Sequence, residues 1–199
     1  MKLYKLTNID GQSGLMDKAV LTQWKIGQTV SLPAKSNSRL CTGGVIHAYK
    51  NANLSLLLNS IHANFSPLRL WEGEGDVVAQ DWGKVGCFAL TLTSEIPLPE
   101  WFSNKVTRRH VMVQFAILCA EAVLSVFEDR FPNDLRPRAA IEAANAANAA
   151  ANVAYVAYVA ANAANAANAA AEAGVGGLDF GALADKAVKL IMDQRGDED

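Results

Sequence analysis

The sequence lacks the short motifs that mark the common catalytic sites. It contains no P-loop, no Gly-x-Ser-x-Gly elbow, no His-Glu-x-x-His pair and no dinucleotide-binding glycine fingerprint. Its glycine cluster at 174–177 does not follow an expected strand, so it does not predict a phosphate loop. We therefore predict no catalytic residue, no cofactor and no metal site, and a protein that is not an enzyme.

Cysteine and positive charge are also scarce. The three cysteines, Cys41, Cys87 and Cys119, are odd in number and far apart, which favours a reducing cytoplasm over a disulfide scaffold. The formal net charge is −2 and no stretch is strongly basic. Because nucleic-acid binding depends on neutralising phosphates, DNA and RNA are not expected partners.

Neither the N-terminal residues nor the alanine-rich stretch predicts a membrane segment. The first residues, MKLYKLTNIDG, alternate polar and apolar side chains and lack the apolar core of a signal peptide. The alanine-rich stretch at 139–173 has an asparagine every three or four residues over much of its length and is too weakly hydrophobic to span a bilayer well. We expect a soluble protein that works inside a cell.

The first hundred residues predict strands. Alternation of apolar and polar residues between turn-forming clusters indicates strands at 2–6, at two places within 19–33, at 45–49, from 68 onward and at 84–99. The same alternation places Val45, His47 and Tyr49 on one face. A short helix is expected at 51–59, with Asn51 or Asn53 as its N-cap.

After Ser103 the apolar residues recur at threes and fours, which predicts a helix at 103–128 that packs on the sheet, with Ser103 as its N-cap. A break at 129–137 precedes the alanine-rich helix, and a last helix is expected at 178–195. Strands followed by helices indicate an α+β fold with a small, mainly antiparallel sheet. The predicted domains are 1–130, 137–173 and 178–195.

Alanine occupies 21 of the 35 positions in 139–173, and this stretch has no Lys, Arg, Gly or Pro. Alanine is the strongest helix former, so the stretch predicts one helix about 50 Å long. A domain of the preceding residues would have a radius of gyration of about 14 Å and could not cover such a rod. We therefore expect the rod to associate with another copy of the chain.

The larger residues of the rod repeat in steps of three, three and four, so the polar stripe winds around the helix. The expected oligomerisation residues are Asn145, Asn148, Asn152, Tyr155, Tyr158, Asn162, Asn165 and Asn168. Small alanines allow close helix contacts with left-handed supercoiling, and asparagines can hydrogen-bond across the seam. A hairpin with the last helix, a solvated spacer, or an ice-binding face are the alternatives.

Two polar clusters have both a functional and an ordinary interpretation. Lys105, Arg108, Arg109 and His110 could meet a phosphate-bearing ligand, or could form a solvated helix start. Glu72 and Glu74 share one face of a strand and could act as acid and base, although exposed strand carboxylates often have no such role.

The order of several short segments resembles the N-terminal domain of uncharacterised bacteriophage proteins that carry a tail of AAN, AAY and AAR repeats. The matching segments are LCTGGVIHAY, IHANF, LRLWEGEGDV and GKVGCFALTLTSEIPLP, and the resemblance covers roughly residues 1–173. A looser similarity links the chain to a wider phage domain with a "GFHA"-like strand. That domain is similar to the ADP-ribosyltransferase core, in which such a strand and a helix hold NAD.

The resemblance implies a ligand-binding set of His47, Tyr49, His62, Asn64, Arg69, Trp71 and Glu74. The transferase series of Arg, Ser-Thr-Ser and Glu is not found in order, so binding without turnover is implied. We expect a phage protein of the host cytoplasm that oligomerises through its alanine-rich helices. It would counteract a host defence system by binding a host protein or sequestering a small nucleotide. The alternatives are an ADP-ribosyltransferase-like enzyme and a structural virion component.

The predicted self-association can be tested directly. Because the alanine surface is expected to need a partner, purified protein at micromolar concentration should have a molar mass of at least two chains in multi-angle light scattering. A mass of one chain across that range would contradict the prediction.

Overall fold

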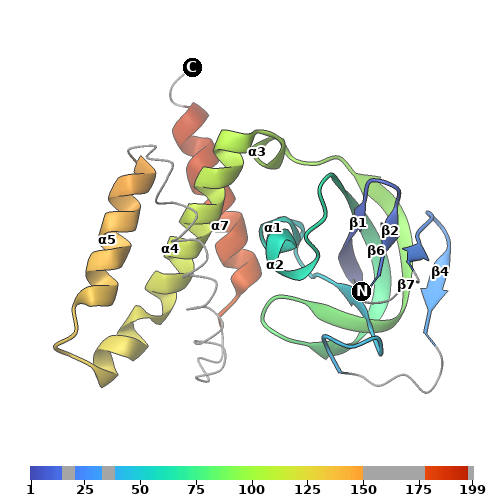
Figure 1. The fold of residues 1–199 in the computed structure, drawn as a ribbon, viewed down its shortest axis with the longest axis horizontal. Coiled ribbons are helices and arrows are strands. Elements are labelled where there is room, and N and C mark those ends of the chain that lie inside the picture. The colour runs from blue at the N-terminus through green and yellow to red at the C-terminus, as the bar shows by residue number, and fades with distance from the viewer. Residues whose placement is uncertain (15–20, 33–38, 150–177, 197–199) are drawn as a thin grey trace. The chain divides into compact units, whose positions relative to one another are not determined.

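The computed structural model describes residues 1–14, 21–32, 39–149 and 178–196, and its fold is α+β, as the sequence predicts. Contacts divide the chain into two compact units, Met1–Pro99 and Glu100–Asp199. In the described residues the first unit holds the strands and two short helices (Figure 1). The described part of the second unit holds helices and no strand.

The main sheet of the first unit is built on a long hairpin. Strands β6, Leu68–Gln80, and β7, Val85–Ile96, pair antiparallel along most of their length. Strand β1, Lys2–Asn8, pairs with the other edge of β6, and two short strands pair with β7: β4, Thr29–Ser31, and β5, Ile46–Ala48. A separate small ladder joins β2, Gln12–Ser13, to β3, Thr22–Gln23.

Backbone hydrogen bonds close the order β1–β6–β7–β5 into a ring. Directly after β5, the Tyr49 N–H donates to the Tyr4 carbonyl at 2.9 Å, and the Tyr4 N–H donates to the Tyr49 carbonyl at 2.8 Å. The ring therefore has an inner face and an outer face. The inner face holds a buried cluster of Leu3, Trp24, Ile46, Ala48, Trp71, Val85, Cys87, Leu90 and Leu92.

Glycines in β6 permit its bends. The register between β6 and β7 shifts at Glu72/Gly73 and again between Gly75 and Ala79, as expected for bulges. A side-chain carbon at Gly73 would lie 2.6 Å from the Thr91 carbonyl oxygen, which is closer than van der Waals contact permits.

Two short helices, α1 at Ala52–Leu57 and α2 at Asn59–His62, follow β5. The Asn51 side chain accepts a hydrogen bond from the Leu54 N–H at 2.8 Å, which confirms Asn51 as an N-cap. Four consecutive leucine or serine positions of α1, Leu54 to Leu57, are buried. These helices place His62 near the end of β5.

The second unit consists of four described helices. After α3, Glu100–Ser103, the long helix α4 spans Lys105–Arg130 and packs against both α5, Arg136–Ala149, and α7, Phe180–Gly196 (Figure 1). By length and composition α4 could cross a membrane, but buried helices of soluble proteins pass the same test.

Two expectations for α4 differ from the structure. The N-cap is Asn104, whose side chain accepts hydrogen bonds from the N–H groups of Val106 and Thr107, whereas Ser103 ends α3. We expected this helix to belong to a domain of residues 1–130. The boundary between compact units instead falls after Pro99, so α4 is grouped with α5 and α7.

The close contact at Gly73 gives a prediction for stability. Gly73→Ala should lower the free energy of unfolding by about 1–3 kcal/mol, because the Thr91 backbone cannot move away from the added carbon. The control is Gly83→Ala, whose nearest neighbour is the flexible end of Leu58 at 2.9 Å, and it should cost less. Urea unfolding followed by tryptophan fluorescence measures both; equal losses would refute the argument.

Candidate functional site

Three of the residues in the implied ligand set gather on the outer face of the sheet. His47 and Tyr49 alternate with Ile46 and Ala48, which belong to the inner cluster, so they point outward. The Tyr49 hydroxyl lies 3.3 Å from His62 Nδ1, and the two rings stack with their centroids 6.0 Å apart. Trp82 of the β6–β7 turn extends the cluster, with its ring centroid 6.2 Å from that of His62.

His47 is fixed by backbone and lysine contacts. Its Nε2 accepts a hydrogen bond from the Cys41 N–H at 3.1 Å, and its carbonyl accepts one from Lys5 Nζ at 2.8 Å. Lys84 Nζ in turn donates to Cys41 Sγ at 3.0 Å. These contacts occupy the ring nitrogen that a catalytic base would need.

Burial makes both histidines weak bases. Burial, together with the smaller effect of the charges of Lys5 and Lys84, lowers the pKa of His47 to about 4. It likewise lowers the pKa of His62 to about 4, with Lys84 again contributing, and it raises the pKa of the Tyr49 hydroxyl. Both imidazoles are therefore neutral at pH 7.

Lys5 faces the interior of the ring, opposite Trp71 in the register. Burial lowers the pKa of its ammonium group to about 8. Its Nζ lies 5.3 Å from the centre of the Trp24 ring, a distance at which a cation is attracted to an aromatic face. With the bond to the His47 carbonyl, this contact compensates for the loss of water.

Arg69 and Trp71 lie on the inner face, away from the histidines. The Trp71 Nε1–H donates to Thr7 Oγ1 at 2.9 Å, and the Arg69 guanidinium stacks 4.3 Å from the centre of the Trp71 ring. Arg69 also forms a two-pronged ion pair with Glu95, which raises the pKa of Arg69 and lowers that of Glu95. The polar groups of Arg69 and Trp71 therefore already have partners within the protein.

The remaining two residues of the set lie elsewhere. Asn64 is exposed and has a backbone φ of 52°, in the left-handed region that asparagine tolerates. Glu74 is exposed on β6, opposite Lys2. The structure thus brings His47, Tyr49 and His62 together, but places Arg69 and Trp71 on the other face of the sheet.

Sequence reasoning did not single out Trp82, Lys5 or the Cys41–Lys84 contact. Each depends on a partner more than ten positions away, and no local pattern signals it. Among the described residues, no group of three or more His, Cys, Asp or Glu side chains could hold a metal ion.

In the second unit, the first part of the alanine-rich helix pairs with α4. Arg138 forms an ion pair with Glu128, Asn145 Nδ2 donates to Glu121 Oε1 at 3.4 Å, and Asn148 Nδ2 donates to Gln114 Oε1 at 3.1 Å. The α4 partners are spaced by seven residues, so they form one stripe along the helix. The buried Asn148 Oδ1 has no hydrogen-bond partner among the described residues.

Thus two of the eight expected oligomerisation residues, Asn145 and Asn148, contact a helix of the same chain. Ile141 and Ala144 pack beside them against Val113 and Ile117. The other six lie outside the described residues: Asn152, Tyr155, Tyr158, Asn162, Asn165 and Asn168.

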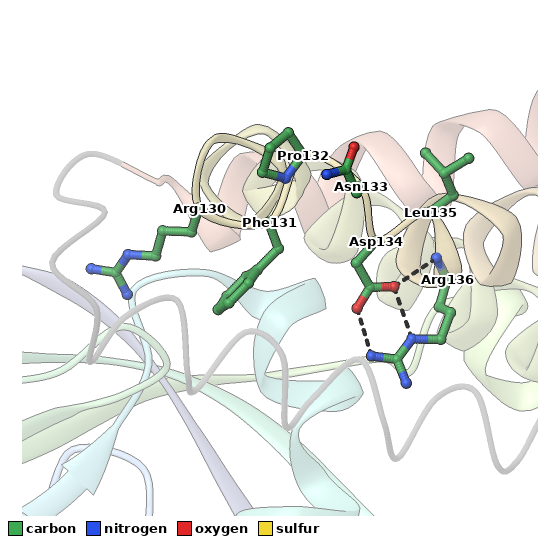
Figure 2. A pocket seen from close by; sticks show the side chains of 7 residues that line it. All are labelled: Arg130, Phe131, Pro132, Asn133, Asp134, Leu135 and Arg136. Atoms are coloured by element: carbon green, nitrogen blue, oxygen red, sulfur yellow. Dashed lines mark hydrogen bonds and ion pairs between the residues drawn. The ribbon is translucent and has the colours of Figure 1, made fainter.

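An open hollow of about 710 Å³ lies at the corner between α4 and α5 (Figure 2). Its lining is Arg130, Phe131, Pro132, Asn133, Asp134, Leu135 and Arg136. Phe131 and Leu135 are 54% and 65% exposed. Hydrogen bonds from Arg136 lower the pKa of Asp134 to about 2 and hold that carboxylate against the guanidinium, as Figure 2 shows.

Comparison with known families identifies one relationship. Residues 103–175 match a family described as "Imm-5 like putative immunity protein". This match covers just over a third of the chain and includes α4 and α5. No curated protein and no solved structure matches the chain significantly. The resemblance of the first unit to phage proteins therefore stays a prediction.

The two half-buried histidines, His47 and His62, predict a pH dependence of stability. Unfolded histidines bind protons below a pKa of about 6.5, whereas the folded ones bind them only near 4. The free energy of unfolding should therefore rise as the pH increases from about 4 to 6.5, and fall when the protein is acidified through this window. His62→Gln, which keeps an acceptor for Tyr49, should remove about half of the histidine part of that slope.

Denaturant unfolding of both proteins at several pH values between 4 and 7.5 measures this difference. An identical slope for wild type and His62→Gln would show that His62 does not titrate between the folded and unfolded states as described.

Proposed function

We propose that this chain is a non-enzymatic binding protein of a bacteriophage that counteracts a host defence system by occupying a host effector protein. The observation that carries the proposal is the match of residues 103–175 to an immunity-protein family. Immunity proteins such as those of colicin nucleases act by binding, and their complexes are among the tightest known. The site of action in this proposal is the host cytoplasm.

The geometry of the first unit supports binding without turnover. His47 and His62 are neutral and engaged by hydrogen bonds, while Arg69 and Trp71 contact each other on the opposite face. An ADP-ribosyltransferase-like site would need these groups to converge on one ligand. Their separation by the sheet disfavours that alternative.

Sequestering of a small nucleotide is the second candidate, and one observation favours it. Tyr49, His62 and Trp82 form a run of aromatic rings on the outer face, and Lys84 lies in the same turn as Trp82. Aromatic rings stack on nucleobases, and a lysine ammonium attracts phosphate. Free nucleotides should therefore be tested as ligands of this chain.

Homo-oligomerisation through the alanine-rich helix is part of the proposal. Ala139, Ala143 and Ala146 are exposed at steps of four and three residues, whereas Ala144 faces α4. A helix of a second copy could approach this small-residue stripe closely. Asn145 and Asn148 would then fix the helix within its own chain, and the remaining asparagines and tyrosines would serve the contact between copies.

The proposal predicts inhibition with a fixed stoichiometry. A host effector captured by crosslinking in infected cells would be purified and titrated with this protein. The activity of the effector should be fully inhibited at a constant molar ratio of this protein to effector. At lower ratios the remaining activity should not fall further with time, because a binding protein acts without turnover. Calorimetry would give the same ratio.

An enzyme would give a different pattern. Progressive inactivation by substoichiometric protein, with label transferred from NAD to the effector, would establish the transferase alternative. Calorimetric binding of free nucleotides without any effector complex would instead support sequestering.

A further inference from the structure

The start of α4 carries a concentrated group of cations. Lys105, Arg108 and Arg109 lie within its first two turns. We call Lys105, Arg108 and Arg109 the basic face. It lies entirely within the helical unit.

The three α4 cations point away from the helix packing. At about 100° per residue, Lys105, Arg108 and Arg109 share one side of the helix. Thr107 and Val111, which are 2% and 0% exposed, lie on the opposite side. The cations are thus on the surface of α4 that α7 leaves uncovered.

The charge order along α4 opposes its own dipole. The positive end of the helix dipole is at the N-terminus, where cations are unfavourable and carboxylates favourable. The first turn of α4 contains no acidic residue, and its three acids, Glu121, Glu128 and Asp129, all lie in its second half. Such local conflicts in an otherwise consistent fold occur mainly where a residue serves function.

The cations of α4 are also poorly compensated within the described chain. Lys105 and Arg109 form no ion pair there, and Arg108 stacks on the Phe102 ring at 4.9 Å. At the opposite end of α4, by contrast, Arg136 and Arg138 are paired with Asp134 and Glu128. Of the two ends of α4, the N-terminal end with the basic face is therefore the one that attracts negative charge.

We propose that the basic face binds an acidic surface of a partner protein. This inference rests on the proposed function and adds the chemistry of the partner. Lys105 and Arg109 are only about 6 Å apart along the helix, which suits a few carboxylates better than an extended phosphate backbone. Val106, 59% exposed, and the aromatic ring under Arg108 add the mixed apolar and arginine character typical of protein interfaces.

The test uses full-length protein and three probes: a fluorescein-labelled decaglutamate peptide, a ten-nucleotide oligothymidylate with the same label, and phosphatidylcholine vesicles containing phosphatidylserine. The test variant is Lys105→Glu/Arg109→Glu. The matched control, Arg130→Glu/Lys186→Glu, has the same net charge change at two positions without ion pairs among the described residues. Fluorescence anisotropy and vesicle sedimentation measure binding.

The peptide should bind wild type and the control within about twofold of each other, and the test variant at least about tenfold more weakly. Raising the salt from about 20 to 200 mM should weaken wild-type binding strongly, since the contact is ionic. The test variant should melt no lower than wild type, because carboxylates suit a helix N-terminus. This readout separates lost binding from lost folding.

Absence of peptide binding, or equal binding by the test variant, would overturn the inference. Tighter binding of the oligonucleotide or of the vesicles than of the peptide would also overturn it, in favour of a nucleic-acid or membrane surface. The proposed function is contradicted by a different result. If an effector complex forms equally well with the test variant, only the inference about the basic face is wrong. If the peptide binds but no effector complex forms, only the proposed function is wrong.

Discussion

The two backbone hydrogen bonds between Tyr4 and Tyr49 set the geometry of the first unit. They join the end of β5 to β1 and so give the sheet an inner and an outer face. Side chains alternate between these faces, and a shift of one residue would exchange them. His47 and Tyr49 are therefore outside because Ile46 and Ala48 are inside. A ligand that touched both the histidines and Arg69 would have to pass through the packed interior.

The helical unit depends on a different constraint, which is the small size of alanine. Helix α5 has few large side chains, so its described part relies on α4 for apolar contact through Val113 and Ile117. The direction and register of α5 on α4 come from polar pairs spaced along one side of α4, from Glu128 to Gln114. A helix surface made of alanines can pack against a neighbouring helix in many registers, because its methyl groups are nearly equivalent. The paired asparagines and the Arg138 ion pair select one of them.

Local pattern predicted the elements well, since alternation and helical periodicity are properties of neighbouring residues. Strands β1, β6 and β7 and helix α4 follow from such patterns, and Asn51 was one of the two N-caps expected for the short helix. Contacts between distant residues were not predictable in this way. Asn104 displaced Ser103 as the cap because α3 already uses Ser103, and the partners of Asn145 and Lys5 lie 24 and 42 positions away. The ligand set implied by the resemblance is divided between the two faces of the sheet, because the closed ring decides which side chains point inward and which point outward.

The composition of α4 shows how packing and charge are divided along one helix. Its middle carries a run of buried residues from Phe115 to Cys119, and burial of such side chains contributes far more to helix stability than the end charges remove. A helix held by its middle can tolerate an unfavourable charge order at its ends. Cations that would shorten an isolated helix are thus retained at Lys105, Arg108 and Arg109, where they remain available for contact with another molecule. The same reasoning explains why the alanine-rich α5, which lacks a comparable buried run, has both of its arginines neutralised, Arg136 by Asp134 and Arg138 by Glu128.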